Sequence, residues 1–299
     1  CLGLPGALPV PNREAVRLAV RAALALGCEV RQRSVWARKS YFYPDLPKGY
    51  QITQEAEPLA VGGRVRIETP EGERRFFGVE RLHVEEDAGK SLHGRGAGGE
   101  TAIDLNRCGH PLVEIVGAAE IADPEQARRY LERLRAVLVA CGVCRGDMES
   151  GALRCDANVS VHRPGEGWGE RVELKNLNSL RFVRRALAHE IERQSASLAR
   201  GEPVMRETRT WDERAACTRV LRSKEEEPDY RYLPEPDLPP LVLDDALREA
   251  AGRALPELPH DTADRLVRER GVAEAEAYRL TVEPSLASYF ERVASAAGD

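Results

Sequence analysis

The sequence predicts an α+β fold, in which antiparallel sheet and flanking helices form one large domain and a helical segment follows. Apolar residues recur at helical spacing in three well-separated segments. Between them, several segments alternate apolar and polar residues, as half-buried strands do. Hydrophobic residues make up 42% of the 299 positions and charged residues 31%, which is ordinary for a globular protein. No apolar run is long enough to cross a membrane.

Three helices are predicted from their caps and apolar stripes. Asn12 precedes a periodic segment that stops at Gly27, and Asp123-Pro124 begins a second helix with a capping residue followed by proline. A third helix is expected from about Leu180 to Ala199. Strands are expected between the helices because period-two alternation dominates there. These are residues 64–69, 74–84, 152–162, 171–175, 205–211 and 218–222, with a turn at 70–72 between the first two.

A domain boundary is predicted in the proline-rich segment that begins at Tyr230. Residues 1–243 form the larger, sheet-containing domain, and residues 244–299 read as short helices broken by prolines, the beginning of a helical domain. The chain opens on Cys1 inside an apolar run with no basic segment before it, so we expect that its natural front end is missing.

Charge and cysteine content bound the function. The chain carries 44 basic and 49 acidic residues, so it is not a dedicated nucleic-acid module, and any RNA contact must come from local patches. Seven cysteines at irregular spacing indicate reduced thiols and a cytoplasmic location. Cys141 and Cys144 form a lone CxxC, open to zinc binding or to burial. The helical stripe that includes Cys141 favours a buried thiol.

The segment His83–Lys90 contains three successive carboxylates, Glu85, Glu86 and Asp87. Such groups repel one another, so they persist either in full solvent or beside a cation. Mg²⁺ prefers oxygen ligands, usually one or two carboxylates with phosphates and water. A solvated turn and a metal site both remain open for this segment.

Glu114 lies inside the apolar run PLVEIV. A carboxylate in a buried strand needs a partner because an unpaired buried charge is costly. A metal ion and an arginine both satisfy that need.

A polar strand face carries Arg154, Asp156, Asn158 and Ser160, and the segment Glu173–Asn178 follows it. Carboxylates, Lys and Arg on a sheet can handle phosphate together with Mg²⁺, or they can form ordinary surface ion pairs. The chain has no GxxxxGK motif followed by Ser or Thr, which excludes a P-loop NTPase. It also has no GxSxG nucleophile elbow.

Eight long strings, in the same order, resemble the GatB family of heterotrimeric tRNA-dependent amidotransferases. They are LPGALPVPN (4–12), ARKSYFYPDLPKGYQITQ (37–54), RLHVEEDAGKSLH (81–93), DLNRCGHPLVEIV (104–116), GALRCDANVSV (151–161), ELKNLNSLRFV (173–183), RETRTWD (206–212) and DYRYLPEPDLPP (229–240). The resemblance implies a cradle domain that binds ATP and Mg²⁺ and phosphorylates the side-chain carboxylate of an Asp or Glu residue that is esterified to tRNA. Ammonia from an amidase partner then displaces the phosphate, giving Asn-tRNA(Asn) or Gln-tRNA(Gln), and a small third protein completes the heterotrimer.

The resemblance also assigns candidate residues. Glu86, with Glu85 as the near alternative, and Glu114 correspond to metal-binding carboxylates, and Lys39 lies where the family has a lysine near the ammonia channel. Further candidates line the site, with Lys90, Arg154, Asp156, Lys175 and Asn178 toward the nucleotide and His83 and Asp87 without firm roles. Cys1 corresponds to the last ligand of a structural Zn²⁺ knuckle that some members carry.

Several departures and alternatives stand beside this interpretation. A front strand with a Glu-x-His pattern that contributes to the family's metal site is absent, and ARKSYFYPD differs from the usual DRKNYFYPD. The related archaeal-type GatE proteins carry an inserted domain, for which residues 230–245 leave no room. A non-catalytic tRNA-binding scaffold is the alternative from another class, and the intact carboxylates argue against it.

Overall fold

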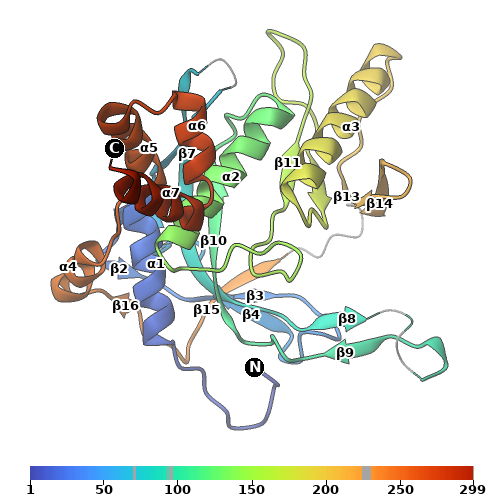
Figure 1. Ribbon diagram of the computed structural model, residues 1–299. Helices are drawn as coiled ribbons and strands as arrows, with labels where there is room; N and C mark the ends of the chain where they lie inside the picture. The colour runs from blue at the N-terminus through green and yellow to red at the C-terminus, as the bar shows by residue number, and fades with distance from the viewer. Residues whose placement is uncertain (70–71, 93, 95–96, 224–229, 299) are drawn as a thin grey trace. The chain divides into compact units, whose positions relative to one another are not determined.

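The computed structural model describes residues 1–69, 72–92, 94, 97–223 and 230–298, and its mixture of helices and sheets confirms the α+β class (Figure 1). Pro70 and Glu71 of the expected turn lie outside the described residues, as do His93 and Asp229 at the ends of two matched strings. The chain forms two compact units. The first comprises residues 1–64, 78–118 and 228–256, and the second comprises residues 65–77, 119–227 and 257–299.

The first unit is built on a sheet whose strands run antiparallel in the order β1, β5, β7 and β10. Their bounds are Glu29–Val30, Ala60–Val61, Arg74–Glu86 and Pro111–Gly117. The long strand β7 also pairs with β6 (Arg64–Glu68) near its beginning, where the chain belongs to the second unit. At the other end of β7, the register places Glu114 directly opposite His83. This pairing positions the carboxylates of the candidate site.

Smaller sheets and two helices complete the first unit. The strand β3 (Ala37–Ser40) lies between β4 (Tyr50–Thr53) and β15 (Arg231–Pro234), so a late segment completes an early sheet. The other pairs are β2 (Arg33–Ser34) with β16 (Leu241–Val242) and β8 (Lys90–Leu92) with β9 (Ala102–Asp104), and the short helix η1 spans Ala97–Gly99.

The helix α1 (Arg13–Ala25) packs against α4 (Asp245–Arg253) in this unit. The predicted cap is confirmed, because Asn12 Oδ1 accepts a hydrogen bond from the Ala15 amide at 3.1 Å. Apolar residues at helical spacing, among them Val16 and Val20, are buried. In this helix the cap and the stripe predicted from sequence both hold.

The second unit has a four-stranded sheet in the order β11, β12, β13 and β14. These strands span Ala157–Val159, Val172–Lys175, Glu207–Asp212 and Cys217–Ser223. The expectation of antiparallel sheet needs one correction here, since β12 and β13 run parallel. The helix α3 (Leu180–Ala199) connects them, and a crossover helix is the usual connection between parallel strands. The helix α2 (Pro124–Ala140) packs on α3, and the predicted Asp123 cap is confirmed.

The core of the second unit lies between these helices and one face of the sheet. Val172 and Leu174 of β12 are fully buried there with Val183 and Ala186 of α3. The alternating segment 152–162 is strand only at Ala157–Val159. The chain turns just before it, where Asp147 Oδ1 accepts hydrogen bonds from the Glu149 and Ser150 amides and the Leu153 amide donates to the Asp147 carbonyl at 3.0 Å. This turn uses the Leu153 amide at the beginning of the predicted strand.

Three helices, α5 (Pro259–Arg270), α6 (Glu274–Thr281) and α7 (Pro284–Ala297), also belong to the second unit. The fully buried Arg133 of α2 contacts one of them, α6, through its guanidinium. It contacts Glu68 Oε2 at 3.1 Å and Thr281 Oγ1 at 3.2 Å, and its Cζ lies 4.4 Å from the centroid of the Tyr278 ring. The predicted domain boundary between residues 243 and 244 does not coincide with the division into these compact units. It stays a prediction.

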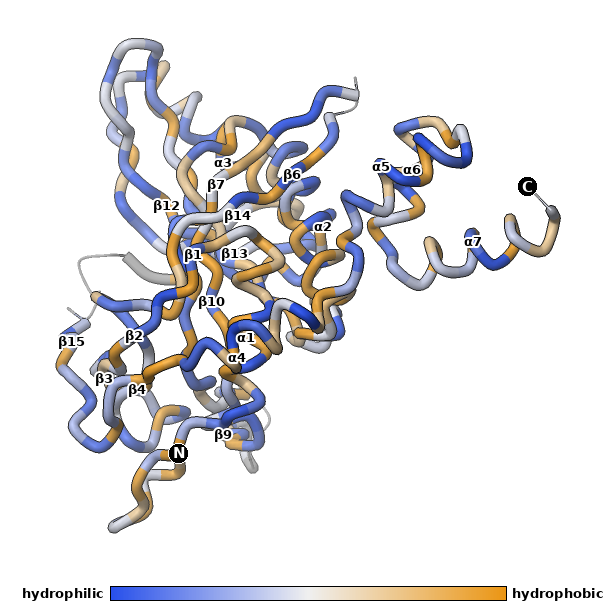
Figure 2. The backbone as a smooth tube through the Cα atoms, turned by 90° about the vertical axis from the view of Figure 1, so that its left-hand side faces the viewer, coloured by the Kyte–Doolittle hydropathy of each residue, from blue (hydrophilic) through white to orange (hydrophobic). Residues whose placement is uncertain are grey.

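Hydrophobic and hydrophilic residues are interspersed along the helices (Figure 2). On α7, Ala287 is buried, whereas Leu286, Tyr289 and Val293 are exposed. Across the described residues, no helix combines the length and the apolar character needed to cross a membrane. Cys141 is buried, as its stripe predicted.

Candidate functional site

Three chemistry-bearing side chains meet on one face of the β7–β10 pair in the first unit. Because side chains alternate along a strand, His83 and Glu85 point to the same face of β7. Glu114 of β10 lies opposite His83 and shares that face. His83 Nε2 lies 3.6 Å from Glu85 Oε2 and 3.4 Å from Glu114 Oε2. One potential ligand atom from each residue lies within 4.8 Å of the others.

Two buried polar residues beside β4 hold this stretch of β7 in place. Gln54 Oε1 accepts the Val84 amide at 3.1 Å, and Gln54 Nε2 donates to Ser34 Oγ at 2.9 Å. Thr53 Oγ1 donates to Glu85 Oε2 at 3.1 Å. Burial keeps these bonds from exchanging with water, so the Glu85 carboxylate has a defined orientation.

The cluster is electrostatically coupled. Burial opposes a charge on the His83 imidazole, yet the facing Glu114 and Glu85 carboxylates raise its pKa above the ordinary value. The pKa of Glu114 is lowered, first by His83 and further by the nearby Lys39 and Arg81. The Glu114 side chain is 47% exposed, so the fully buried strand expected from PLVEIV does not form. Its carboxylate is half open to solvent and to an incoming ligand.

The neighbouring carboxylate, Glu86, points to the opposite face of β7. There it forms an ion pair with Lys48, with side-chain exposures of 12% and 10%. Its Oε1 also accepts the Ile52 amide at 2.8 Å. The pleat thus separates two adjacent glutamates, giving one to the cluster and one to a lysine. Glu86 as the preferred metal ligand stays a prediction, while the geometry favours Glu85.

The cluster's donor set fits a divalent cation. Two carboxylate oxygens and one imidazole nitrogen converge, and the arrangement has more acidic than basic groups. In the part of the chain described, His83 Nδ1 is buried and makes no hydrogen bond. Mg²⁺ binds through a few carboxylates and completes its shell with water and phosphate oxygens. Glu85, Glu114 and His83 are therefore the residues that would hold it.

The other predicted residues of the first unit, Lys39, Asp87 and Lys90, differ in how they interact with the cluster. Lys39 is in the centre of its sheet, with Nζ 4.6 Å from the centroid of the Tyr230 ring, and its charge acts on Glu114. Asp87 is buried and receives Arg107 Nε at 3.0 Å. Lys90 is exposed on β8, opposite Asp104 in register. The structure therefore relates Lys39 to the cluster and gives Asp87 a local ion pair.

A second group of charges lies on the outer face of the sheet in the second unit. Lys175 Nζ contacts Asp156 Oδ2 at 2.8 Å and Glu173 Oε1 at 3.1 Å. Burial opposes the charge of Lys175, but the two carboxylates raise its pKa above the ordinary value. Arg154 is exposed two residues before Asp156. The predicted polar face thus exists, and it holds a positively charged lysine.

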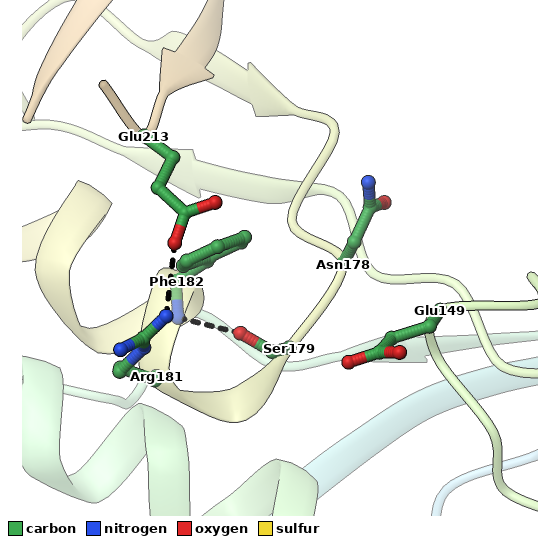
Figure 3. A pocket seen from close by; sticks show the side chains of 6 residues that line it. All are labelled: Glu149, Asn178, Ser179, Arg181, Phe182 and Glu213. Atoms are coloured by element: carbon green, nitrogen blue, oxygen red, sulfur yellow. Dashed lines mark hydrogen bonds and ion pairs between the residues drawn. The ribbon is translucent and has the colours of Figure 1, made fainter. Parts of the chain in front are cut away.

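Asn178 lines a hollow of about 470 Å³ at the beginning of α3 (Figure 3). Ser179 caps the helix by accepting the Phe182 amide at 3.1 Å, and Arg181 donates to Glu213 at 2.9 Å across the hollow. The amides of a helix beginning favour anions. Two glutamates, Glu149 and Glu213, also line this space, so its charge is mixed.

Sequence reasoning missed several residues that shape these sites. They are Lys48, Thr53, Gln54, Ser179 and Thr208. A signal existed for Ser179 alone, which stands three residues before the predicted helical stripe and is a preferred capping residue. The others act across strands, and their partners depend on a register that local patterns do not give.

Comparison with known proteins points in one direction. Residues 1–249 match the family described as "GatB/GatE catalytic domain". The chain is 51% identical over 295 residues to the aspartyl/glutamyl-tRNA(Asn/Gln) amidotransferase GatB protein of Myxococcus xanthus, covering 98% of this chain and 61% of that protein. The same-named proteins of Anaeromyxobacter dehalogenans strain 2CP-1 (50% over 299 residues, 100% and 62% covered) and Thermotoga maritima (51% over 295 residues, 97% and 61% covered) are equally similar. The chain thus spans about three-fifths of their length.

Proposed function

Because the chain belongs to the GatB/GatE catalytic-domain family, we propose that it supplies the kinase and amidation site of an aspartyl/glutamyl-tRNA(Asn/Gln) amidotransferase, as part of its GatB component. The observation that carries the proposal is the convergence of His83, Glu85 and Glu114 on one strand face. Phosphoryl transfer depends mainly on positioning and on neutralising phosphate charge. A divalent-cation site of this kind, in a chain of this family, suits that chemistry.

The proposed reaction has two steps. The amino acid, Asp or Glu, is esterified to tRNA through its α-carboxyl group; an oxygen of its free side-chain carboxylate attacks the γ-phosphorus of ATP, and ADP leaves. Ammonia then attacks the carbonyl carbon of the acyl phosphate, loses a proton, and releases phosphate with the amide. The proposed product is Asn-tRNA(Asn) or Gln-tRNA(Gln).

The chain's own residues have distinct parts in this proposal. Glu85, Glu114 and His83 hold the cation, and bound Mg²⁺ supplies neutralisation of the phosphate charge. Lys39, whose charge already acts on Glu114, faces the reacting carboxylate or the incoming ammonia. Lys175 offers an ammonium to phosphate oxygens. Further nucleotide contacts are proposed for Lys90, Arg154 and Asn178, with Asp156 as the partner of Lys175, and Glu86 remains a proposed participant through Lys48.

The partners follow from the proposed reaction. The amidase partner delivers ammonia from glutamine, a small third protein completes a cytoplasmic heterotrimer, and misacylated Asp-tRNA(Asn) or Glu-tRNA(Gln) is the substrate. A structural Zn²⁺ at Cys1 rests on the resemblance alone. Within the described residues the one group of three metal-type side chains is His83, Glu85 and Glu114, and Cys1 is not part of it.

The test uses the full-length GatB protein in complex with its amidase and small partners. We expect release of the ATP γ-phosphate to require both Mg²⁺ and misacylated tRNA, and to be lost in Glu114→Ala. Uncharged tRNA is the control. Release without any dependence on the charged species would leave only a tRNA-binding scaffold and would overturn the proposal.

A further inference from the structure

Lys175 has more negative partners than a single ammonium needs. Both Asp156 and Glu173 contact its Nζ, so two of the three N–H donors of this ammonium are directed at carboxylates. An anion that approaches Lys175 therefore competes with these two carboxylates. The two carboxylates differ in how firmly the structure holds them.

Glu173 is held firmly. It lies in the middle of β12, directly opposite Thr208 of the parallel neighbour β13. The fully buried Thr208 donates its hydroxyl to Glu173 Oε2 at 2.9 Å, while Oε1 faces Lys175. The Glu173 side chain is only 19% exposed. Both oxygens are therefore engaged in a place that water reaches poorly.

The end of β12 is also fixed, which holds the Lys175 backbone. Asn176 adopts a positive φ of 61°, unusual for a residue other than glycine. Its Nδ2 donates to Thr210 Oγ1 at 2.8 Å, which ties this turn to β13. The lysine thus stands on an anchored strand end, beside an anchored glutamate.

Asp156 is held much less firmly. It precedes β11 rather than lying within it, and its side chain is 52% exposed. An exposed ion pair contributes little, because water replaces the partner readily. Of the two carboxylates at Lys175, Asp156 is the one that an incoming anion can displace.

We propose that Glu173 and Thr208 are positioning residues for Lys175, and that Asp156 is an exchangeable partner that nucleotide phosphate displaces. This inference rests on the proposed ATP-dependent function and deepens it. Before exchange, the Asp156 carboxylate competes with phosphate for the Lys175 ammonium. Exchange frees the Asp156 carboxylate at the moment that Lys175 takes an anion, so we expect binding to be helped by a divalent cation that accompanies the nucleotide.

The test measures ATP affinity directly, by titration calorimetry on the complete heterotrimer, with Mg²⁺ and with EDTA. In Asp156→Asn the competing charge is gone, so affinity for ATP in EDTA should rise about tenfold, and the gain from Mg²⁺ should shrink. Glu173→Gln and Thr208→Val should weaken ATP binding about fivefold in both conditions. Thr208→Ser keeps the hydroxyl and should restore affinity. Glu202→Gln, in an exposed ion pair with Arg200, is the matched control.

Each outcome decides something. The exchange would be overturned if Asp156→Asn weakened ATP binding in EDTA as much as Lys175→Met does. That result would show that Asp156 is a fixed ligand. Thr208→Ser that fails to restore affinity, with its melting temperature unchanged, would overturn the positioning role. If the wild-type complex binds ATP and releases phosphate but all these variants bind ATP as Glu202→Gln does, this inference is wrong and the proposed function is retained. A wild-type complex that binds no ATP would overturn both.

Discussion

Two carboxylate clusters in this chain are built from similar residues, but the carboxylate of one is fully paired and the carboxylates of the other are not. In the second unit, the fully buried Glu190 contacts Arg193 and Arg209 and accepts hydrogen bonds from Gln194 and Thr218, both at 3.0 Å. Burial alone would raise its pKa, but these partners lower it instead. In the first unit, Glu85 and Glu114 share one histidine, and Glu114 is half exposed.

The difference separates structure from function. A buried charge whose partners saturate it has nothing left to bind, and removing a partner costs folding energy. A cluster with excess carboxylates and an open side keeps its binding capacity for a cation. The same contrast appears within one dipeptide, since Glu86 is saturated by Lys48 and the Ile52 amide while Glu85 is not.

The largest expected effect comes from breaking the saturated cluster. Glu190→Gln removes the buried carboxylate that Arg193 and Arg209 share and leaves both with Glu207 alone, and we expect the free energy of unfolding to fall by about 3 kcal/mol. Urea unfolding of the chain measures this. Glu202→Gln, in an exposed pair, should change it by less than about 0.5 kcal/mol. Equal small losses in both variants would show that burial of Glu190 has no energetic weight.

The open cluster should respond in activity instead of stability. In the full-length heterotrimer, Glu114→Gln should lower tRNA-dependent phosphate release about 100-fold, because a cation ligand is lost. Its melting temperature should fall only slightly, because the half-exposed Glu114 loses its charge interaction with His83. Unchanged phosphate release together with a markedly lower melting temperature would place Glu114 among the structural residues.

The adjacent glutamates offer a sharper version of the comparison. Glu85→Gln should weaken Mn²⁺ binding, followed by electron paramagnetic resonance, about tenfold with little change in stability. Glu86→Gln leaves Lys48 unpaired in a mostly buried place and should cost about 2 kcal/mol of stability, with Mn²⁺ affinity kept within about twofold. The reverse pattern would assign the cation to Glu86, as the sequence resemblance preferred.

The smallest effect is expected from pH. Burial lowers the pKa of His260 on α5, and the charges of Arg66 and Arg133 lower it further, against the opposing effect of Asp261 and Glu68. As pH falls below the ordinary histidine value of about 6.5, the unfolded chain takes up this proton more readily than the folded chain. Stability from this residue is therefore present at neutral pH and lost in mild acid. His260→Gln should flatten the stability change between about pH 7 and about pH 5.5, and an unaltered slope would contradict the assignment.

The predictions from sequence succeeded where the signal was local. The caps at Asn12 and Asp123 and the helix from Leu180 to Ala199 depend on neighbours within one or two turns, and the structure confirms all three. The parallel pairing of β12 and β13 was missed, although a strand, a long helix and another strand in succession are its usual signature.

The candidate site was predictable only in part. Because side chains alternate along a strand, His83 and Glu85 lie on one face and Glu86 lies on the other. The EED motif alone did not separate the two glutamates. Glu114 joins them through the β7–β10 register, which depends on long-range pairing. Lys48 lies 38 residues from Glu86, and nothing in the local pattern connects them.

The sheet around Lys39 has a consequence for how this protein is made. Arg38 Nε donates to Glu235 Oε2 at 2.8 Å, and the two residues lie 197 positions apart. A ribosome that adds about 5–20 residues per second needs about 10 to 40 s to bridge that gap. During this interval the edge of β3 that β15 later covers stays unpaired. Lys39 also lacks its contact with the Tyr230 ring. The nascent chain must therefore be kept from pairing with other chains until β15 emerges.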